Sequence, residues 1–362
     1  MDKKTLVIAG GGTGGHIYPG LALADHLKKQ HPEWQVHFVG AKGGLEESII
    51  PRYHYPLHCL RMDRLHSSAG WKKRLRAMVL MPFAIIHSMY LYFKIKPTWV
   101  LGVGGFASGP FVLTASLLGG NTALLEPNAY PGMANRWLSK VVRYCFVVFD
   151  NSLKFFPKAK VRQVGLPVRM KKGSPGTSYD KNQPLNLLVF GGSQGSVAIN
   201  EVVGEWVEHM GMQAPHYKIL HQVGSRDFAR WQKRYGEKYK HFLEYCEYIH
   251  DMPEKLKWAD LVICRAGVGT VAEIAMSCRP AIFIPLPTAA DNHQQKNAEA
   301  LVNKQAALMI LQKDFYWENL QRQVKELREN PQQLDLMKQN LMTIDYSKAP
   351  EQIIGALVKG NA

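Results

Sequence analysis

Short apolar runs alternate along the chain with longer segments of helical pattern. The runs are rich in β-branched residues and apolar on both faces, which is typical of strands buried in a parallel sheet. They cover residues 5–9, 35–39, 98–103, 123–125, 144–149, 185–190, 217–222, 260–264, 281–284 and 307–311. The segments between them, such as residues 19–30, 199–209 and 270–277, are long enough for crossover helices. The pattern therefore predicts an α/β fold with parallel sheets.

The chain divides into two halves of similar design. Residues 166–184 are rich in Gly, Pro, Ser and charged residues, which is typical of a linker. Each half opens with a strand that runs directly into glycines and then a helix pattern. We expect two doubly wound, Rossmann-like domains, over residues 1–165 and 185–345. We expect residues 346–362 to form a C-terminal helix that packs back on the N-terminal domain.

The charge of the chain is unevenly distributed. The 362 residues include 45 Lys and Arg against 29 Asp and Glu, a formal net charge of +16. Residues 1–170 hold 22 Lys and Arg and 8 Asp and Glu, so this half carries +14, and Glu126 is the only acid between Asp63 and Asp150. The N-terminal half is therefore expected to meet a polyanion, either a nucleic acid or an anionic membrane.

Cysteines and hydropathy indicate a cytosolic chain that does not span a membrane. The five cysteines are odd in number and lack the close pairing of zinc sites or disulfide frameworks, so we interpret them as reduced core thiols. Residues 1–4 lead directly into a strand, and we expect no signal peptide. The longest apolar stretch, residues 77–93, contains Pro82 and His87 and is shorter than the roughly 20 residues that cross a bilayer.

Two glycine turns follow predicted strands of the N-terminal half. Residues 10–15 are glycines and one Thr, followed by His16, and a turn of this kind lets backbone N–H groups approach an anion at a helix N-terminus. Alone, the turn also suits a dinucleotide dehydrogenase, a sugar transferase or simple tight packing. The dehydrogenase is disfavoured because Lys42, and not an acid, follows the next strand. The second turn contains Gly104, Gly105 and Ser108 and belongs to the same predicted sheet edge.

The C-terminal half offers groups suited to a nucleotide sugar. Residues 264–273 combine a strand end, a glycine turn and a helix that carries Glu273 in its first turns. A carboxylate there can accept two hydrogen bonds from a ribose diol, beside a helix N-terminus that favours phosphate. Residues 291–297 form an amide-rich loop suited to sugar hydroxyls. A solvated helix face and a helix cap are the alternative interpretations of these two features.

Seven motifs occur together in one order along the chain. They are Gly11-Gly-Thr-Gly-Gly-His16, Gly104-Gly-Phe-Ala-Ser-Gly-Pro110, Glu126-Pro-Asn128, Gly165-Leu-Pro-Val-Arg169, Gly191-Gly-Ser-Gln-Gly195, Arg265-Ala-Gly with Thr270-Val-Ala-Glu273, and His293-Gln294 with Asn297. Together they resemble the MurG family of peptidoglycan synthesis over nearly the whole chain. The resemblance implies a GT-B fold and an inverting, metal-independent transfer of N-acetylglucosamine (GlcNAc) from UDP-GlcNAc to the 4-hydroxyl of lipid I. The product would be lipid II, and no cofactor is implied.

The resemblance also implies roles for individual residues. His16 matches a histidine implicated in catalysis, as a base or as a donor to the acceptor diphosphate, and Gly104, Gly105 and Ser108 form a candidate acceptor loop. The residues implied to bind UDP-GlcNAc are Thr13, Gly14, Gly15, Asn128, Arg169, Ser193, Ile249, Val268, Gly269, Thr270, Val271, Ala272, Glu273, Gln294 and Asn297. Within this set Ser193 would contact phosphate, the backbone of Ile249 would bind uracil, and Glu273 would bind the ribose.

The chain departs from the family pattern in a few places, and its mechanism is expected to need no metal. Leu125, Pro127, Leu166 and His293 stand where the family usually has other residues, which affects the acceptor site most.

No Asp-x-Asp metal motif is evident, so helix N-termini and Ser193, with Arg169 or Arg265, would stabilise the leaving diphosphate. His16 suits proton acceptance because an ordinary histidine titrates near pH 6.5.

An amphipathic segment gives the basic half a membrane partner. In residues 71–83, Lys72, Lys73, Arg74 and Arg76 precede large apolar residues, and an ordinary helix packed on the sheet is the alternative. The predicted membrane patch consists of Lys72, Lys73, Arg74, Leu75, Arg76, Met78, Val79 and Phe83. We expect a peripheral protein on the cytoplasmic face of the inner membrane, with other cell-wall synthesis proteins as partners.

Two rival functions remain open at the level of sequence. Another GT-B enzyme of UDP-sugars would act on a different lipid acceptor, or as a 2-epimerase. A basic nucleic-acid-binding protein is the more distant rival, because charge alone would allow it. It is disfavoured because the bases share a segment with Met, Leu and Phe and no nucleic-acid-binding module is evident.

Overall fold

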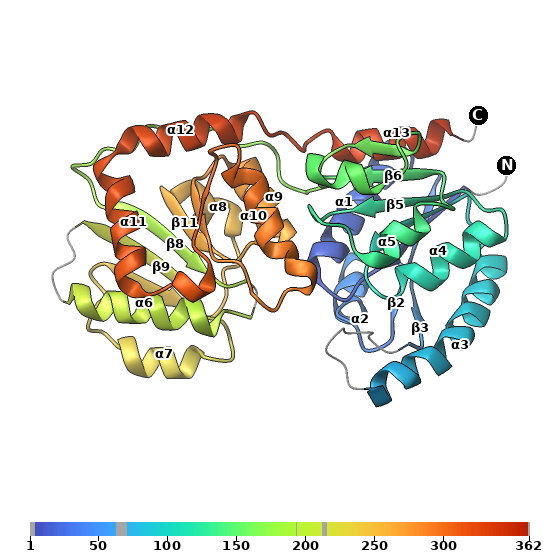
Figure 1. The fold of residues 1–362 in the computed structure, drawn as a ribbon, viewed down its shortest axis with the longest axis horizontal. Helices are drawn as coiled ribbons and strands as arrows, with labels where there is room; N and C mark the ends of the chain where they lie inside the picture. The colour runs from blue at the N-terminus through green and yellow to red at the C-terminus, as the bar shows by residue number, and fades with distance from the viewer. Residues whose placement is uncertain (1–3, 63–70, 193, 212–215, 361–362) are drawn as a thin grey trace. The chain divides into compact units, whose positions relative to one another are not determined.

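A computed structural model describes residues 4–62, 71–192, 194–211 and 216–360, with the side chains of residues 71–79 left out. The chain forms two compact units. Unit 1 comprises Met1–Arg169 and Tyr346–Ala362, and unit 2 comprises Met170–Asp345. Figure 1 shows a sheet covered by helices in each unit.

Unit 1 is built on a parallel sheet of seven strands. The strands are β1 (Thr5–Gly10), β2 (Gln35–Ala41), β3 (Leu57–Leu60), β4 (Trp99–Gly104), β5 (Thr122–Glu126), β6 (Tyr144–Val147) and β7 (Val161–Gln163). Their order is β3-β2-β1-β4-β5-β6-β7, and every neighbouring pair is parallel. The order reverses between β1 and β4, which makes their carboxyl ends the expected ligand site of this doubly wound sheet.

Helices bury both faces of this sheet. The helical elements are α1 (Gly14–Gln30), α2 (Glu46–Ile49), η1 (Ile50–Tyr53), α3 (Trp71–Ile95), α4 (Ser108–Leu117), α5 (Met133–Leu138), η2 (Asp150–Phe155) and α13 (Ala349–Lys359). Leu21 of α1 and Ile353 of α13 are fully buried in the core on one face. Phe111 of α4 and Leu91 of α3 are buried in the core on the other. The last helix of the chain thus completes the core of the first unit.

Unit 2 repeats the design with six parallel strands. They are β8 (Leu185–Phe190), β9 (Tyr217–Gln222), β10 (Leu243–Cys246), β11 (Leu261–Cys264), β12 (Ala281–Phe283) and β13 (Leu308–Met309), in the order β10-β9-β8-β11-β12-β13. The helical elements are α6 (Val197–Met210), α7 (Phe228–Tyr235), α8 (Met252–Trp258), α9 (Val268–Ser277), η3 (Ala290–Asn292), α10 (His293–Val302), η4 (Gln312–Asp314), α11 (Trp317–Glu329) and α12 (Pro331–Met342). The order reverses between β8 and β11.

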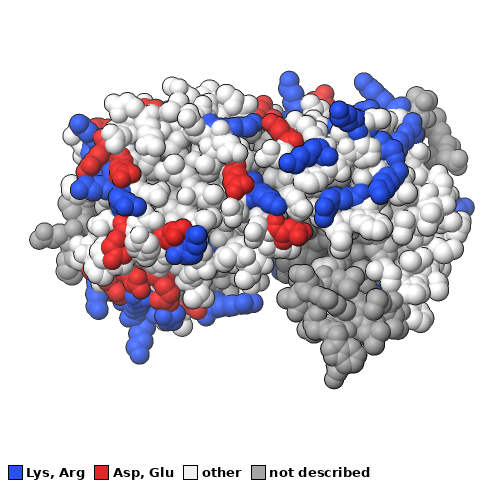
Figure 2. Space-filling view, in the orientation of Figure 1, with Lys and Arg blue, Asp and Glu red and all other residues white. Residues whose placement is uncertain are grey.

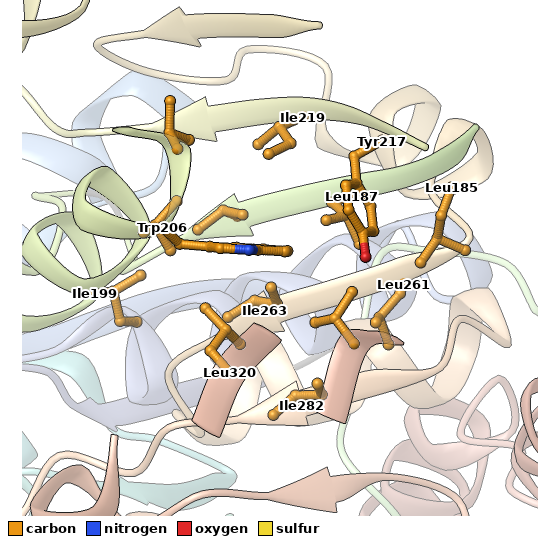
Figure 3. Close-up of a cluster of buried hydrophobic side chains, with 14 of the residues drawn as sticks. Leu185, Leu187, Ile199, Trp206, Tyr217, Ile219, Leu261, Ile263, Ile282 and Leu320 are labelled. Atoms are coloured by element: carbon orange, nitrogen blue, oxygen red, sulfur yellow. The ribbon is translucent and has the colours of Figure 1, made fainter. Parts of the chain in front are cut away.

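The core of unit 2 is dense and aromatic. Figure 3 shows Trp206 of α6 lying across the side chains of β8, β9 and β11, with Leu320 of α11 beside them. Trp206 and Leu320 are fully buried, and burying a large apolar side chain stabilises a fold by about 1.5–3 kcal/mol. This core fixes the strand ends from which the glycine turn after β8 and the helix after β11 emerge.

The α/β fold with two parallel sheets is confirmed, and the predicted strands and helices all occur with small shifts of their ends. The structure adds β3, β7 and β10, which the sequence pattern did not predict. Each of them lies at the edge of its sheet. The segment with the predicted membrane patch belongs to α3, a helix of 25 residues. None of the helices within the described residues has the length and hydropathy of a membrane span.

Candidate active site

The first glycine turn places His16 in the opening turns of α1, at the carboxyl end of β1. Nδ1 of its ring lies 3.2 Å from the carbonyl oxygen of Gly11 and 3.2 Å from Oγ1 of Thr13. A carbonyl oxygen only accepts, so the hydrogen of the neutral ring belongs on Nδ1. Nε2 is then the nitrogen that can take up a proton, as a general base requires.

The same turn has fewer amides to offer an anion than its sequence suggests. The amide of Gly11 donates to the carbonyl of Gly104 at 3.1 Å, and that of Gly12 donates to Oε2 of Glu46 at 2.8 Å. The helix α1 begins at Gly14 with Thr13 as its N-cap, and the first amides of a helix have no partner within it. Anion binding on this turn is therefore left to the amides at the start of α1, among them those of Gly14 and Gly15.

The second glycine turn, after β4, is joined to the first. A Cβ at Gly105 would collide with the carbonyl oxygen of Gly11, and Gly105 has a positive φ of 84°. A Cβ at Gly104 would lie 2.8 Å from Nε2 of His16, so the imidazole lies directly on this turn. Ser108 is 1% exposed and its hydroxyl lies against Gly102, so this member of the candidate acceptor loop belongs to the core side of the turn.

A buried carboxylate holds Asn128 in place. Oε1 of Glu126 accepts from the backbone amide of Asn128 at 3.0 Å and from its side chain at 3.3 Å. Oε2 accepts from the amide of Gly132 at 3.1 Å and from the side chain of Asn135 at 2.9 Å. Burial raises the pKa of Glu126 to about 7, although the four hydrogen bonds lower it. Glu126 thus organises the loop between β5 and α5 that carries Asn128.

Arg169 makes its contacts within unit 1. Its guanidinium lies 2.7 Å from Oδ2 of Asp25 and 4.1 Å from the ring centre of Tyr53. Asp25 also accepts a hydrogen bond from the hydroxyl of Tyr55 at 2.9 Å. Both partners of the ion pair are partly exposed, and such pairs contribute little stability. The ion pair with Asp25 therefore costs little to break.

In unit 2 the glycine turn after β8 rests on the loop after β9. A Cβ at Gly195 would collide with the carbonyl of Val223, and a Cβ at Gly224 with that of Gln194; both glycines have positive φ, of 76° and 85°. The side-chain amide of Asn200 donates to the carbonyl of Val223 at 2.8 Å and fixes that loop from within. The phosphate-contacting candidate of this turn, Ser193, lies outside the described residues.

The helix α9 begins with amides that have no partner within the helix and carries a carboxylate one turn further on. Gly267 is its N-cap, so the amides of Val268, Gly269 and Thr270 lie in the turn whose N–H groups have no partner within the helix. The amide of Val271 donates to the carbonyl of Gly267 at 2.9 Å, and the side chains of Val271 and Ala272 are buried. Of the six predicted site residues on α9, Val271 and Ala272 therefore contribute packing and not amides.

Glu273 projects from the same helix and is partly buried. Burial raises the pKa of Glu273 to about 7, and among the described residues no hydrogen bond to its carboxylate is recorded. A carboxyl group that is partly protonated at neutral pH gains when hydroxyl donors reach it, because they favour the ionised form. The site is thus suited to a vicinal diol.

The remaining donor-site candidates are placed with varying exposure. Ile249 is 6% exposed, which leaves its backbone as the group that could contact a base. Gln294 in α10 accepts a hydrogen bond from the amide of Leu286 at 3.0 Å. Asn297 is fully buried, and its amide lies 3.5 Å from the carbonyl oxygen of Ala266, in the loop before α9. Gln294 and Asn297 therefore tie α10 to the loops after β11 and β12.

Arg265 does not present its charge to a ligand in this structure. Its guanidinium donates to Oγ of Ser196 twice, to the carbonyls of Ile284 and Pro285, and to Oε1 of Gln312, at 2.8–3.2 Å. All five N–H donors of an arginine are thus used. The prediction that Arg265 could stabilise a leaving diphosphate is not supported by this geometry, which makes it a support of the turn after β8.

Two residues of the site were missed at the level of sequence. Glu46 is 1% exposed and holds the first glycine turn, and Glu126 holds Asn128. The signal for Glu126 was its isolation as a single acid in a long basic stretch. The signal for Glu46 was that glycines, Gly40 and Gly44, stand close to it in the sequence. In the structure a Cβ at either glycine would collide with the side chain of Glu46.

The described part of α3 carries a row of exposed apolar side chains. Phe83, Ile86, Tyr90 and Phe93 are each at least 58% exposed. Lys72, Lys73, Arg74, Leu75, Arg76, Met78 and Val79 of the predicted patch lie outside the described side chains. Figure 2 shows acids and bases mixed over unit 2, whereas the described surface of unit 1 on that face carries Lys and Arg with few acids. The described residues hold no cluster of three or more His, Cys, Asp or Glu arranged for a metal ion.

Family models match both units. The Glycosyltransferase family 28 N-terminal domain matches residues 6–147, and the Glycosyltransferase family 28 C-terminal domain matches residues 186–353. Among solved structures, MurG of Acinetobacter baumannii superposes with a TM-score of 0.79 at 29% identity, covering 98% of this chain and 99% of that one. A UDP-GlcNAc 2-epimerase of Neisseria meningitidis, with a TM-score of 0.66 over 98% of this chain and all of that one, shares the fold at 14% identity.

Curated relatives agree over almost their full length. A protein of Bdellovibrio bacteriovorus is 45% identical over 342 residues, 94% of each chain, and one of Myxococcus xanthus is 37% identical over 98% of this chain and 92% of its own. Both are named UDP-N-acetylglucosamine--N-acetylmuramyl-(pentapeptide) pyrophosphoryl-undecaprenol N-acetylglucosamine transferase. The chain therefore belongs to glycosyltransferase family 28 and, within it, to the MurG family of N-acetylglucosaminyltransferases.

Proposed function

We propose that the protein transfers GlcNAc from UDP-GlcNAc to the 4-hydroxyl of the N-acetylmuramyl residue of lipid I, forming lipid II and UDP. The observation that carries the proposal is the 45% identity over 94% of the chain to a relative named for this transfer. This reaction belongs to peptidoglycan synthesis, and so to cell shape and cell division. The two glycine turns, His16 and Glu273 supply the groups that the reaction needs.

Unit 1 activates the acceptor in this proposal. The 4-hydroxyl oxygen attacks the anomeric carbon of the donor, and its proton passes to Nε2 of His16. The hydrogen bond from Nδ1 to the carbonyl of Gly11 keeps the ring in the tautomer that can accept this proton. The amides at the start of α1 and the side chain of Asn128 bind the phosphates and the sugar of UDP-GlcNAc.

Unit 2 holds the donor and its leaving group. The amides of Val268, Gly269 and Thr270 face the diphosphate, where the helix N-terminus stabilises the negative charge that develops on UDP. Glu273 accepts the ribose hydroxyls, and the backbone of Ile249 binds uracil. Gln294, Asn297 and Ser193 complete the donor site, with Arg169 as a further phosphate contact.

A transfer assay tests the proposal and its rivals. Labelled UDP-GlcNAc and a lipid I analogue, with a chelator of divalent cations present, should give labelled lipid II. The rival 2-epimerase shares the fold and would convert UDP-GlcNAc without any acceptor, so product analysis with and without lipid I distinguishes the two. Turnover of UDP-GlcNAc only without acceptor, or none with lipid I, would overturn the proposed transfer.

An anionic membrane surface is the proposed partner of α3. Its outward face exposes Phe83, Ile86 and Phe93, which could enter the boundary between headgroups and acyl chains. A hollow of about 580 Å³ adjoins this face and is lined by Lys42, Glu47, Cys59, Arg61, Phe83 and His87. Each basic residue near an anionic surface contributes about 1 kcal/mol to binding. We place the protein peripherally on the cytoplasmic face of the plasma membrane, where other cell-wall synthesis proteins could bind it.

Vesicle binding tests the membrane proposal separately. The protein should sediment with vesicles that contain anionic lipid, and much less with zwitterionic vesicles. Ile86→Asp should weaken this binding about tenfold or more, because it places a charge in the apolar face. Leu336→Asp, at an exposed apolar position of unit 2, is the matched control. Equal binding to both kinds of vesicle would contradict the electrostatic part, and unchanged binding of Ile86→Asp would contradict the role of α3.

A further inference from the structure

Glu46 is the most enclosed acid beside the candidate active site, and the proposed mechanism does not use it. It is 1% exposed and stands at the start of the one-turn helix α2. Its Oε1 accepts from the backbone amide of Ala41 at 2.7 Å, and its Oε2 accepts from that of Gly12 at 2.8 Å. One carboxylate therefore joins the end of β2 to the glycine turn after β1, across 34 residues of sequence.

Three glycines make room for this carboxylate. A Cβ at Gly11, Gly40 or Gly44 would collide with the side chain of Glu46, and Gly11 also has a positive φ of 154°. The enclosed acid thus explains why these three positions are glycine. A buried acid that glycines from two loops surround is a built feature and not a solvated surface charge.

The contact leads directly to the catalytic candidate. Glu46 holds the amide of Gly12, and the carbonyl of the preceding residue, Gly11, lies 3.2 Å from Nδ1 of His16. The amide of Gly11 in turn donates to the carbonyl of Gly104, on the second turn. A shift of the first turn away from Glu46 would therefore move the group that orients the imidazole. It would also move the amides at the start of α1.

We infer that Glu46 is a positioning residue of the transfer site: its carboxylate fixes the first glycine turn so that His16 faces the acceptor hydroxyl and only the amides at the start of α1 bind phosphate. The inference rests on the proposed function for its kinetic consequence. The positioning of the turn itself does not depend on which acceptor the enzyme uses.

Glu46→Gln in the full chain is the direct test. A glutamine of the same shape can accept from only one of the two amides, and its own NH₂ group then faces the other donor. We expect kcat with a lipid I analogue to fall at least about tenfold, the range for losing a hydrogen bond to a charged group. The affinity for UDP should stay within about twofold, because in the proposed function unit 2 binds the uracil and the ribose.

Hydrogen exchange provides a readout that does not depend on transfer. In the unliganded protein the amides of residues 10–16 should exchange faster in Glu46→Gln than in the wild type. Glu46→Asp, which keeps the charge but shortens the side chain by one methylene, should show the same two effects. It also serves as the second variant if the glutamine protein does not fold. Glu47→Gln is the matched control: this exposed neighbour accepts from the amide of Gly43 at 3.0 Å and contacts the thiol of Cys59, and should behave as the wild type.

The outcomes separate this inference from the proposed function. Faster exchange in Glu46→Gln together with a loss of kcat at constant affinity for UDP supports it. Wild-type exchange and kcat in Glu46→Gln would overturn it, as would a loss of UDP affinity equal to the loss of kcat. If the wild type shows no transfer to lipid I but Glu46→Gln still exchanges faster at residues 10–16, the proposed function fails and the positioning of the turn stands.

Discussion

The glycine turns after β1 in unit 1 and after β8 in unit 2 have similar sequences and different supports. The first is held by a buried carboxylate, that of Glu46, which accepts from the amide of Gly12. The second rests on neutral side chains and on the guanidinium of Arg265, which donates to Oγ of Ser196. Asn200 donates to the carbonyl of Val223, Nε2 of His221 lies 3.2 Å from Oδ1 of Asn200, and its Nδ1 lies 3.0 Å from the hydroxyl of Tyr235.

This difference follows the chemistry that we assign to each turn. Unit 1 must hold one imidazole in one orientation, and a buried acid with two backbone donors fixes its turn by direct hydrogen bonds. In the proposed function the turn of unit 2 faces the diphosphate of UDP, and the supports named above for that turn include no carboxylate. Glycine turns of like sequence can therefore be supported according to what each must bind.

A matched pair of glycine substitutions offers the strongest way to break this comparison. In Gly105→Ala the new Cβ meets the carbonyl of Gly11 and separates the two turns of unit 1; in Gly224→Ala it meets the carbonyl of Gln194. We expect Gly105→Ala to lower kcat about 100-fold with nucleotide binding intact, because small displacements of catalytic groups have large effects. Gly224→Ala should instead raise the KM for UDP-GlcNAc about tenfold or more. Steady-state kinetics with both substrates decides, and the same kinetic defect in both variants would contradict the division of roles.

The ionisation of Glu273 sharpens the role of unit 2. Burial raises its pKa to about 7, and ribose hydroxyls that donate to it would favour the ionised form, so UDP should bind more tightly as the pH rises from 6 to 8. In Glu273→Gln the affinity should be about tenfold lower at pH 8, and the part of the pH dependence that belongs to this carboxyl should disappear. Calorimetric titrations of both proteins measure this, with Glu254→Gln on the exposed face of α8 as the control. A pH dependence that Glu273→Gln retains in full would exclude the carboxylate from the nucleotide site.

Buried titrating groups should give the two units opposite responses to pH. Burial lowers the pKa of His221 to about 3, so the unfolded chain binds the extra proton below pH 6.5 and unit 2 loses stability as the pH falls, by about 2 kcal/mol at pH 5. Burial raises the pKa of Glu126 to about 7, so this group costs unit 1 stability as the pH rises from 4.5 through 7, up to about 3 kcal/mol.

Native-state hydrogen exchange can follow the two units separately. Between pH 7 and 5 the slowest amides of unit 2 should lose protection relative to those of unit 1. His221→Gln should remove the loss of stability that unit 2 shows as the pH falls. Glu126→Gln should remove the loss of stability that unit 1 shows as the pH rises from 4.5 through 7. Parallel changes in both units would show that other groups dominate the pH response.

Sequence periodicity predicts the buried strands at the centre of each sheet, whereas of the four edge strands it predicts only β13. β1, β4, β8 and β11 are fully or almost fully buried on both faces, and their apolar runs were sufficient to predict them. The strands that were missed, β3, β7 and β10, are half-exposed edge strands whose mixed composition carries no clear period. The glycine turns could be predicted because they follow central strands directly.

The supports of the turns could not be predicted because they depend on contacts distant in sequence. Glu46 acts on Gly12 across 34 residues, and His221 acts on Asn200 across 21. The hydrogen bond that Arg265 donates to Ser196, 69 residues away, likewise became visible only in the fold. Residues that contact a ligand follow a local motif, whereas residues that hold them follow the topology.

His16→Ala is the most direct test of whether the turn of unit 1 performs the chemistry while unit 2 holds the nucleotide. Transfer from UDP-GlcNAc to a lipid I analogue and binding of UDP would be measured on the same preparations, with His31→Ala, just after the end of α1, as the control. The account predicts that kcat falls about 100-fold or more, the usual contribution of a general base, with UDP affinity within twofold of the wild type. Unchanged kcat, or an equal loss of UDP affinity, would contradict it.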